Sequence, residues 1–465
     1  MIQFKRLQKT ELTFLRDYFE NCPITFNDLS VGVRYLWCDE FIIEYAIVDD
    51  TVILKESYEG EKDAFYFPMG NNIEKALSVI EQHSIEKSIP IRFCCIDTPT
   101  METLKARYYI TESHSELNWN DYIYNAEDFK TYKGKKFSTQ RNHLNKFKRN
   151  YPNYQFSVMT SGDLPDVMAF LKEYFSLTKK QSSTFLGEEK NIPDYIANFE
   201  YLDQQGGIIR VDGKIVGLSV GEVVRDTLIV HVEKALKSYD GVYPVMAQEF
   251  AKAFATEKVK YINREEDCGD SGLRYSKTQY NPIEIKDKWV VVAKTVFENI
   301  AKPIYIKTDR LTIEDIPESD KADYYRLYMD DELNKLWGYD YRDDCKGTPT
   351  PDYFYNFQLS LKQNKEEYSL AVKKDGKMVG ELVLHNFDFF GGVEMGFRFF
   401  SDCQGKGYAT ESALALKEYV KTTLKAKFLK SRCFKQNIPS KNLIGRIGLK
   451  EWYEDQTRYF FREEL

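Results

Sequence analysis

The most regular hydrophobic pattern in the chain lies near its C-terminal end. Apolar residues recur there at spacings of four, three, four and four, as expected for one buried face of an α-helix, at Ala409, Ala413, Leu416, Val420 and Leu424. An apolar run, 393–400, comes shortly before, and the segment Gln404-Gly405-Lys406-Gly407 lies between the two. The pattern predicts a strand, a tight turn and a helix in direct succession.

Changes of pattern divide the 465 residues into three blocks, and a chain of this length is too long for one hydrophobic core. Residues 1–130 alternate helical segments with strand-like runs at 41–48, 51–55 and 91–96. Residues 131–302 place helices before three apolar runs, 206–213, 214–224 and 227–235, and a helix at 243–256. Residues 303–465 contain a strand at 304–316, helical material at 322–336 and a hairpin with an Asp375-Gly376 turn. We expect three domains of mixed α/β structure, at 1–130, 131–302 and 303–465.

Composition narrows the class of protein. Hydrophobic residues make up 43% and charged residues 29% of the chain, which is typical of a globular protein, and the net charge of -7 argues against a general nucleic-acid binder. The N-terminus lacks the apolar core of a secretory signal, and no apolar stretch reaches the length of a membrane span. The eight cysteines have no metal-type spacing to the histidines. We expect a cytoplasmic protein with reduced thiols, no integral membrane segment and no metal site.

The segment from Gln404 to Thr410 has the features of a phosphate-binding turn. Glycines let the backbone approach a ligand closely, and the start of a helix offers backbone N–H groups and the positive end of the helix dipole. Two common phosphate-binding patterns do not fit, because the Rossmann motif needs Gly or Ala where Thr410 stands and no P-loop sequence occurs. The segment is therefore either a pyrophosphate-binding turn of another type or an ordinary turn.

The Q-x-x-G-x-A pattern of Gln404, Gly407 and Ala409 resembles the acyl-CoA pyrophosphate loop of the Gcn5-related N-acetyltransferase (GNAT) family. Over about 160 residues, further segments are similar to the branch of that family that acetylates N-terminal amines of ribosomal proteins: Thr308-Asp309-Arg310-Leu311, Gly407-Tyr408-Ala409-Thr410-Glu411, Asn437-Ile438-Pro439-Ser440 and Gly448-Leu449. The resemblance implies an N-acetyltransferase that uses acetyl-CoA or a related acyl-CoA. Its acceptor would be a primary amine, either on a small molecule or at a protein N-terminus.

The same resemblance implies roles for individual residues. It assigns the pyrophosphate to Gln404, Gly405, Lys406, Gly407, Tyr408, Ala409 and Thr410. It also implies that a backbone N–H near Phe399 or Phe400 meets the oxyanion, where the sheet splays to admit the pantetheine arm. Asn437 would contact that arm or orient the substrate, and Ser440 would lie near the CoA sulfur.

Amine acylation requires a group that removes a proton from the ammonium and a group that protonates the thiolate. Glu394, on the strand before the turn, is the first candidate base, acting through water, and Glu381 on the preceding strand is the second. Each is otherwise a solvated strand carboxylate. The tyrosine that serves as acid in many relatives is replaced by Ile444, so Ser440 is the candidate proton donor, with Tyr453 in reserve. The loop 338–352 and the aromatic residues that follow it are expected to shape the acceptor pocket.

Residues 1 to about 300 carry a second resemblance, to a family of unknown activity related to the C-terminal domain of phosphatidylglycerol lysyltransferases. It rests on the segments Asp121-Tyr122-Ile123-Tyr124, Gly134-Lys135-Lys136, Arg141-Asn142-His143, Glu233-Lys234-Ala235 and Asn263-Arg264-Glu265-Glu266-Asp267, with Arg274 and Lys277. That family resembles two acyltransferase-like folds fused in tandem. The expected fold class is therefore α/β with mixed sheets, in three GNAT-type acyltransferase-like units, two at the N-terminus and one at the C-terminus.

Two groups of residues form the candidate site of the N-terminal region. The segment 129–162 contains no Asp or Glu, and its cations, including Lys135, Lys136 and Arg141, suit the phosphates of a tRNA or of a cofactor. Alternatively, this segment is an amphipathic helix that buries Phe137, Leu144, Phe147 and Tyr151. Arg264, Glu265, Glu266 and Asp267 form either the floor of a site or an ion-pair network, in which Arg274 and Lys277, on a predicted turn, pair with the carboxylates. His143 and His231 are interpreted as hydrogen-bonded structural histidines.

Three functions follow from these features. The first is acyl transfer from acyl-CoA to a primary amine through the C-terminal domain. The second is aminoacyl transfer from aminoacyl-tRNA through the N-terminal region, with the basic segment 130–149 as the docking surface. In the third, the N-terminal region is a non-catalytic binding module fused to an acetyltransferase.

Overall fold

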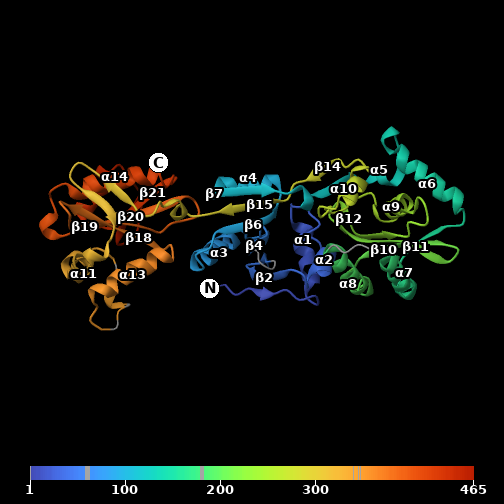
Figure 1. Cartoon of the computed structure of the whole chain (residues 1–465), viewed down its shortest axis with the longest axis horizontal. Helices are drawn as coiled ribbons and strands as arrows, with labels where there is room; N and C mark the ends of the chain where they lie inside the picture. Colours follow the sequence, from blue (N-terminus) through green and yellow to red (C-terminus); the bar gives the residue numbers. More distant parts are fainter. Residues whose placement is uncertain (1, 58–62, 178–182, 339, 344, 346) are drawn as a thin grey trace. The chain divides into compact units, whose positions relative to one another are not determined.

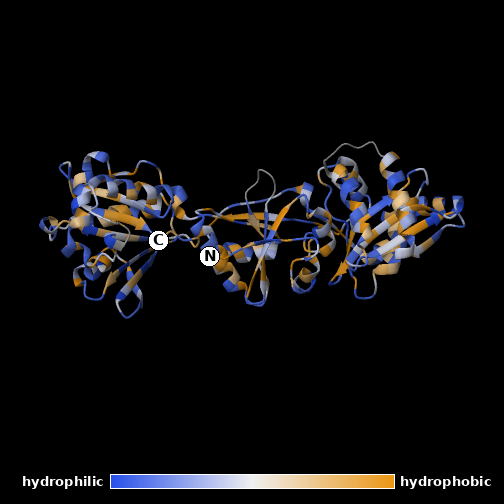
Figure 2. Cartoon of the chain, turned by 90° about the horizontal axis from the view of Figure 1, so that it is seen from below, coloured by the Kyte–Doolittle hydropathy of each residue, from blue (hydrophilic) through white to orange (hydrophobic). Residues whose placement is uncertain are grey.

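The computed structural model describes residues 2–57, 63–177, 183–338, 340–343, 345 and 347–465. The chain forms two compact units. The first contains residues 1–83, 91–103 and 112–292, and the second contains 84–90, 104–111 and 293–465. Figure 2 shows hydrophobic residues concentrated on the strands and hydrophilic residues along the outer helices.

The first sheet has eight strands and contains one parallel step. Its order is β1 (Lys5–Arg6), β2 (Ile42–Val48), β3 (Thr51–Ser57), β4 (Ala64–Phe65), β6 (Ile91–Ile96), β15 (Trp289–Ala293) and β7 (Ile110–Ser115), with β5 (Met69–Gly70) paired to β3. The strands from β1 to β4 are antiparallel, whereas β4 and β6 run parallel. Parallel neighbours need a crossover, and α3 (Ile73–Glu86) provides it.

The second sheet repeats this plan. Its order is β14 (Glu284–Lys286), β8 (Asp121–Asn125), β13 (Tyr261–Asn263), β12 (Thr227–Ala235), β11 (Lys214–Val224), β10 (Gln205–Val211) and β9 (Gln155–Val158). The strands from β9 to β12 form an antiparallel meander, and β12 and β13 are parallel. The helix α9 (Val242–Phe254) connects the parallel pair.

The third sheet, in the second unit, has the same plan. Its order is β16 (Tyr305–Lys307), β17 (Thr312–Asp315), β18 (Glu367–Lys374), β19 (Lys377–His385), β20 (Gly392–Phe399), β21 (Phe428–Phe434), β23 (Arg458–Glu464) and β22 (Lys450–Glu454). β20 and β21 are parallel and are connected by α14 (Tyr408–Thr422). Figure 1 shows α14 on one face of this sheet, with α11 (Lys321–Met329) and α13 (Pro351–Gln363) on the other. The predicted fold class, mixed α/β with three acyltransferase-like units, is confirmed.

The other helices lie between these strands: α1 (Arg16–Asn21), α2 (Val31–Trp37), α4 (Thr98–Arg107), α5 (Ala126–Thr131), α6 (Ser138–Asn150), α7 (Leu164–Leu177), α8 (Ser183–Ala197), α10 (Ser271–Thr278), α12 (Asp331–Asn334) and α15 (Ile438–Arg446). The helical segment predicted at 322–336 is broken into α11 and α12. The break occurs because the Asp330 side chain accepts a hydrogen bond from the Leu333 N–H and so starts a new helix.

The order of strands does not follow the order of the chain in the first unit. β8 precedes residue 130 yet belongs to the second sheet. β15 comes after all the strands of the second sheet in the chain, yet it belongs to the first sheet. The division into domains at 1–130, 131–302 and 303–465 stays a prediction.

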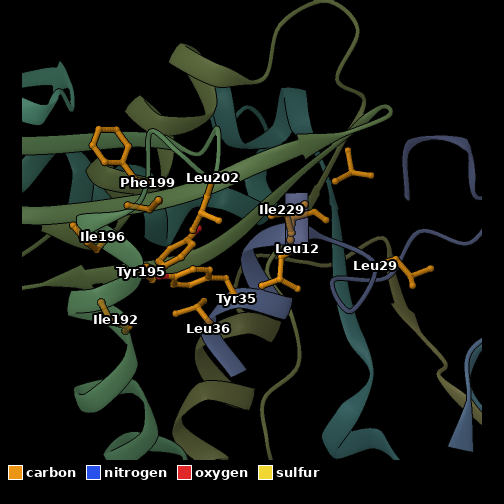
Figure 3. Close-up of a cluster of buried hydrophobic side chains, with 14 of the residues drawn as sticks. Leu12, Leu29, Tyr35, Leu36, Ile192, Tyr195, Ile196, Phe199, Leu202 and Ile229 are labelled. Atoms are coloured by element: carbon orange, nitrogen blue, oxygen red, sulfur yellow. The ribbon is translucent and has the colours of Figure 1, made fainter. Parts of the chain in front are cut away.

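The largest core of the first unit joins the N-terminal helices to the second sheet. Tyr35 of α2 packs against Tyr195 of α8 with ring centroids 6.3 Å apart, and Leu12 and Ile229 belong to the same buried cluster (Figure 3). In the second unit, Ala413, Leu416, Val420 and Leu424 are fully buried against the third sheet, and Ala409 is half-buried. The predicted buried face of α14 is therefore confirmed.

Candidate active site

The turn before α14 is open to solvent. Gly407 is the N-cap residue, with φ of 81°, and Gly405 has φ of 71°. Gln404 to Gly407 are exposed. A Cβ atom at Gly405 would meet nothing within 4 Å, and one at Gly407 would meet only the Arg310 guanidinium, at 3.3 Å. Glycine adopts this left-handed conformation without strain, so the backbone itself forms the exposed surface.

The first turn of α14 leaves backbone donors unused. The Glu411 N–H donates to the Gly407 carbonyl at 3.1 Å, which is the first hydrogen bond of the helix. No residue in the described part of the chain accepts a hydrogen bond from the N–H of Tyr408, Ala409 or Thr410. Three N–H groups and the positive end of the helix dipole therefore meet at one exposed point, which is the arrangement that binds phosphate groups.

A brace from the start of the third sheet holds this turn. Arg310 donates from Nε to Glu411 at 2.7 Å and from Nη1 to the Lys406 carbonyl at 3.0 Å, and its guanidinium lies 5.0 Å from the centroid of the Tyr408 ring. The Thr308 hydroxyl donates to the same Glu411 carboxylate at 2.6 Å. Burial alone would raise the pKa of Glu411, but these hydrogen bonds hold it below its usual value. The Thr308-Asp309-Arg310 motif thus positions the turn, a role that the sequence did not assign to it.

The two parallel strands beside the turn separate along their length. β20 and β21 are paired at Gly392, Val393 and Glu394, yet β20 continues to Phe399 and β21 to Phe434. The Ser431 hydroxyl donates to the Met395 carbonyl at 2.9 Å where the separation begins. Pairing between these two strands therefore stops after Glu394 and leaves a gap in the third sheet beside the turn, as the predicted splay requires.

Phe399 and Phe400, at the end of β20, differ in the direction of their backbone N–H groups. The Phe400 N–H donates to the Val379 carbonyl of the β19 strand at 3.2 Å, so the proposal of an oxyanion contact there is wrong. Adjacent N–H groups of a strand point to opposite edges, so the Phe399 N–H points toward the gap. The Gln404 side-chain amide donates to the Phe399 carbonyl at 3.1 Å and holds the turn to the end of the strand. Lys406 is exposed in the turn.

Glu381 is fully buried, so its interpretation as a solvated strand carboxylate is wrong. Its register partner on β20 is Arg398, whose Nε donates to the carboxylate at 2.6 Å. The Arg398 guanidinium lies between the rings of Tyr328 and Trp337, with centroid distances of 4.2 Å and 4.8 Å. Glu381 therefore serves as the counter-ion of a buried arginine, which makes it a poor candidate for a base that must meet a substrate.

Glu394 is 8% exposed, so the solvated interpretation fails here too. Its two oxygens have separate partners: the Arg432 Nε forms an ion pair with Oε1 at 3.0 Å, and Asn386 donates from Nδ2 to Oε2 at 2.9 Å. The His385 Nε2 lies 3.8 Å from Oε1. Sequence analysis did not name His385, which is the register partner of Glu394 on β19.

The remaining catalytic candidates lie on α15 and β22. Asn437 is the N-cap residue of α15, and its side-chain oxygen accepts a hydrogen bond from the Ser440 N–H at 3.2 Å. The N-x-x-S motif thus starts a helix at this point. Tyr453 is 54% exposed on β22, and β21 and β23 separate that strand from β20, so the structure does not bring Tyr453 to Glu394.

The aromatic segment after the predicted acceptor loop contributes partly to the core. Phe354 is fully buried and stacks on Tyr328 at 4.2 Å, whereas Tyr353 and Tyr355 are half-buried. Positions 339, 344 and 346 of the loop lie outside the described residues.

The basic segment of the first unit is an amphipathic helix, as the alternative interpretation predicts. Phe137, Leu144 and Phe147 are buried and Tyr151 is half-buried. Lys136 pairs with Asp128 at 2.8 Å, and Arg141 donates to the carbonyls of Tyr132 and Gly134. Lys135 is exposed in the turn before α6.

The second group of N-terminal candidates forms an ion-pair network. Arg264 donates to Glu233 at 2.7 Å beneath the Tyr280 ring. Arg274 pairs with Asp267 at 2.8 Å, which confirms one predicted pairing. The pairing predicted for Lys277 is wrong, because its ammonium donates to backbone carbonyls, those of Arg264, Glu265 and Glu266. Both cations lie on α10, where a turn was predicted; Asp270 caps this helix.

His231 and Lys288 extend that network. His231 lies between Glu222 and Glu265, with distances of 3.0 Å from Nε2 and 2.8 Å from Nδ1, as expected for a structural histidine. Burial alone would lower the pKa of His231, but the two carboxylates raise it to about 9. Glu266 lies 3.4 Å from the buried ammonium of Lys288.

Two protein families match two successive regions of the chain. The model of the family described as "Phosphatidylglycerol lysyltransferase, C-terminal" matches residues 24–292, which is more than half of the chain. The chain belongs to this family. A second model, "Acetyltransferase (GNAT) domain", matches residues 310–450, so the lysyltransferase-type region is followed by an acetyltransferase domain that transfers acyl groups.

Individual relatives are similar to part of the chain. A crystal structure of a conserved protein of unknown function from Bacteroides thetaiotaomicron is 30% identical, covers 63% of this chain and 100% of its own, and has a TM-score of 0.58. The uncharacterized N-acetyltransferase YnaD of Bacillus subtilis (strain 168) is 24% identical over 176 residues, which are 35% of this chain and 99% of that protein. The C-terminal domain of a putative lysylphosphatidylglycerol synthetase from Agrobacterium fabrum is 15% identical, over 61% of this chain and 92% of its own, with a TM-score of 0.44.

This member of the lysyltransferase C-terminal family has neither a membrane-spanning helix nor a metal-binding cluster among its described residues. None of the described helices is both long and apolar enough to cross a bilayer. Within the same residues, no group of three or more His, Cys, Asp or Glu side chains is arranged to hold a metal ion.

Proposed function

We propose that the acetyltransferase domain transfers an acetyl group from acetyl-CoA to a primary amine, on a small molecule or at a protein N-terminus. The observation that carries the proposal is the exposed start of α14, where the N–H groups of Tyr408, Ala409 and Thr410 have no acceptor among the described residues. Acetyl-CoA supplies a diphosphate for these donors and a thioester for the reaction.

The gap in the third sheet continues from this turn. The Phe399 N–H, and by the same alternation that of Phe397, point toward the gap, where they would stabilise an oxyanion. One face of the gap is filled by α14 and its buried residues. The opposite face has Glu394 of β20, so we expect the amine to approach and lose its proton on that side. Ser440, in the first turn of α15, is the proposed donor of a proton to the departing thiolate.

Binding of acetyl-CoA tests the proposed cradle directly. Gly407→Glu places a carboxylate among the three N–H groups and forces a side chain into a left-handed backbone, so we expect the dissociation constant for acetyl-CoA to rise at least about 100-fold by calorimetry. Gly376→Glu is the matched control, because Gly376 also has a positive φ, 79°, in an exposed hairpin with nothing within 4 Å of an added Cβ. Equal affinity in the two variants would remove the assignment of the cradle.

Transfer to an amine needs its own assay. Release of the CoA thiol is measured with spermidine, ethanolamine and a short peptide that has a free N-terminal serine. Acceleration above hydrolysis by any of these amines supports the proposal, and absence of acceleration by all three contradicts an amine acceptor.

In the lysyltransferase-type region, three of the candidate cations are engaged within the protein. Arg264, Arg274 and Lys277 are held by groups of the protein itself, as described above. The hypothesis of aminoacyl transfer from tRNA therefore gains no support from this geometry.

A further inference from the structure

A row of ionisable side chains crosses three strands of the third sheet. Glu367 on β18 is the register partner of His385 on β19, which is in turn the partner of Glu394 on β20. Directly paired side chains project from the same face, with Cβ atoms about 5 Å apart. Met395 and Leu384, the next residues along, belong to the core that α14 covers, so the row lies on the opposite face.

His385 is placed for proton transfer better than either neighbour. Both oxygens of Glu394 already have partners, since one forms an ion pair with Arg432 and the other accepts a hydrogen bond from Asn386. The His385 side chain is 22% exposed, and its Nε2 lies 3.8 Å from Glu394. Burial lowers the pKa of His385 below its usual value, against the pull of Glu394, and so favours the neutral imidazole, which is the form that accepts a proton.

The imidazole also lies beside the position where the strands separate. A Cβ atom at Gly396, two residues beyond Glu394 in β20, would be 3.7 Å from the His385 Nε2 and 3.0 Å from the Trp337 ring. The absence of a side chain at Gly396 thus lets the histidine and the indole approach the strand that lines the gap. An amine bound against Trp337 would meet His385.

We propose that His385 is the general base of the acyl transfer and that Glu394 is its positioning residue. The inference rests on the function proposed above. The ammonium of the acceptor gives one proton to the His385 Nε2, and the nitrogen lone pair then forms the C–N bond. As the C–S bond of the thioester breaks, the attacking nitrogen loses its second proton. The thiolate takes one proton, either from Ser440, which recovers its own from that nitrogen, or from solvent. Glu394 stabilises the imidazolium until its proton returns to solvent.

The other charged groups around the row fit this assignment. Burial, with a smaller contribution from Glu381, raises the pKa of Glu367 to about 7, so this carboxyl is only partly ionised next to His385 at neutral pH. Arg432 and Lys430 approach from β21, and Lys430 is paired with Asp388. The Glu381–Arg398 ion pair lies four residues from the His385–Glu394 pair along β19 and β20. Its two opposite charges cancel each other.

The test compares His385→Gln and His385→Ala with His114→Ala, an exposed histidine of β7. The assay is release of the CoA thiol with spermidine, ethanolamine or the N-terminal serine peptide, whichever is fastest. We expect kcat to fall about 100- to 10,000-fold in both His385 variants, because this is the usual contribution of a general base, while the dissociation constant for acetyl-CoA changes less than about twofold. His114→Ala should match the wild type.

Two readouts separate a base from a structural histidine. In the wild type, kcat/KM should rise with pH and level off with an apparent pKa below 6.5, whereas in His385→Gln it should keep rising toward the pKa of the free amine. Imidazole added to His385→Ala should restore activity at least about 10-fold, and it should not stimulate His385→Gln to the same extent. Glu394→Gln should lower kcat and shift the pH midpoint downward.

The outcomes distinguish the two proposals. If the wild type does not bind acetyl-CoA, or releases no thiol with any of the amines, the proposed function is contradicted. Normal turnover in the wild type, with His385→Ala within about threefold of it and an unchanged pH profile, overturns the role of His385 alone.

Discussion

The helices α9 and α14 begin in the same structural setting, yet the surroundings of their first turns differ. Each follows the last antiparallel strand of a meander, starts after a glycine with φ above 80° and leads to a parallel strand. The turn before α14 is exposed. At α9, by contrast, a Cβ atom on Gly241 would be 2.2 Å from the His143 carbonyl oxygen, because α6 packs directly against the start of the helix.

Contacts around Gly241 show how α6 covers the turn before α9. Asp240 pairs with His143 and Lys146 of α6, and the Val242 N–H donates to the Tyr239 carbonyl at 3.1 Å. A strand, a glycine turn and a helix therefore do not define a phosphate site by themselves. What covers the first turn decides whether its donors are available, and in the lysyltransferase-type region the basic helix fills that position.

The largest expected effect in this comparison is on stability. Gly241→Ala forces a methyl group against the His143 carbonyl in a left-handed backbone, so we expect the first unit to lose about 3 kcal/mol or more of unfolding free energy in urea, with acetyl-CoA affinity unchanged. Gly376→Ala, with a similar φ and open surroundings, should cost about 1 kcal/mol. Equal losses would mean that α6 does not close the turn.

A smaller effect comes from the charges inside the first unit. The pKa of His231 is raised to about 9 between its two carboxylates, above the usual value near 6.5 for an unfolded chain. Its stabilising contribution is therefore complete below pH 6.5 and is lost as the pH rises through about 9. His231→Gln should destabilise the first unit by on the order of 2 kcal/mol at pH 6 and by clearly less at pH 9.5. A pH-independent difference in urea unfolding would contradict a protonated His231.

The smallest effect concerns the brace of the open turn. Arg310→Ala removes the contacts to Glu411 and the Lys406 carbonyl, so we expect the turn to lose order and the dissociation constant for acetyl-CoA to rise about fivefold, or about 1 kcal/mol, by calorimetry. Arg342→Ala removes a comparably exposed arginine that pairs with Asp331 and Asp340, and it should leave the affinity unchanged. Similar affinities in both variants would show that the turn needs no brace.

Sequence analysis predicted local features of this site and missed features that depend on strand register. The buried face of α14 and the glycine turn were predictable because their periodicity and glycine positions are continuous in sequence. Glu381 was assigned to solvent because nothing nearby in the chain indicates that Arg398, 17 residues away, is its partner. His385 gave no signal at all, since a lone histidine at the end of a strand becomes notable only when the register places it between Glu367 and Glu394.

The first unit shows the same limit. The amphipathic pattern of the basic segment correctly indicated that Phe137, Leu144 and Phe147 are buried, but not that Phe147 lies against the start of α9. The apolar run of β15 predicts a strand, whereas its place in the first sheet is set by packing over a long distance in sequence.

The position of β15 has a consequence for the newly made chain. This strand lies between β6 and β7 in the first sheet, although every strand of the second sheet is encoded between β7 and β15. On the ribosome, β6 and β7 therefore emerge long before the strand that fills the slot between them. Until then both present unpaired edges, which are prone to join strands of other chains. Nascent chains that stall before residue 289 should consequently be targets for chaperones or aggregation, whatever the stability of the finished protein.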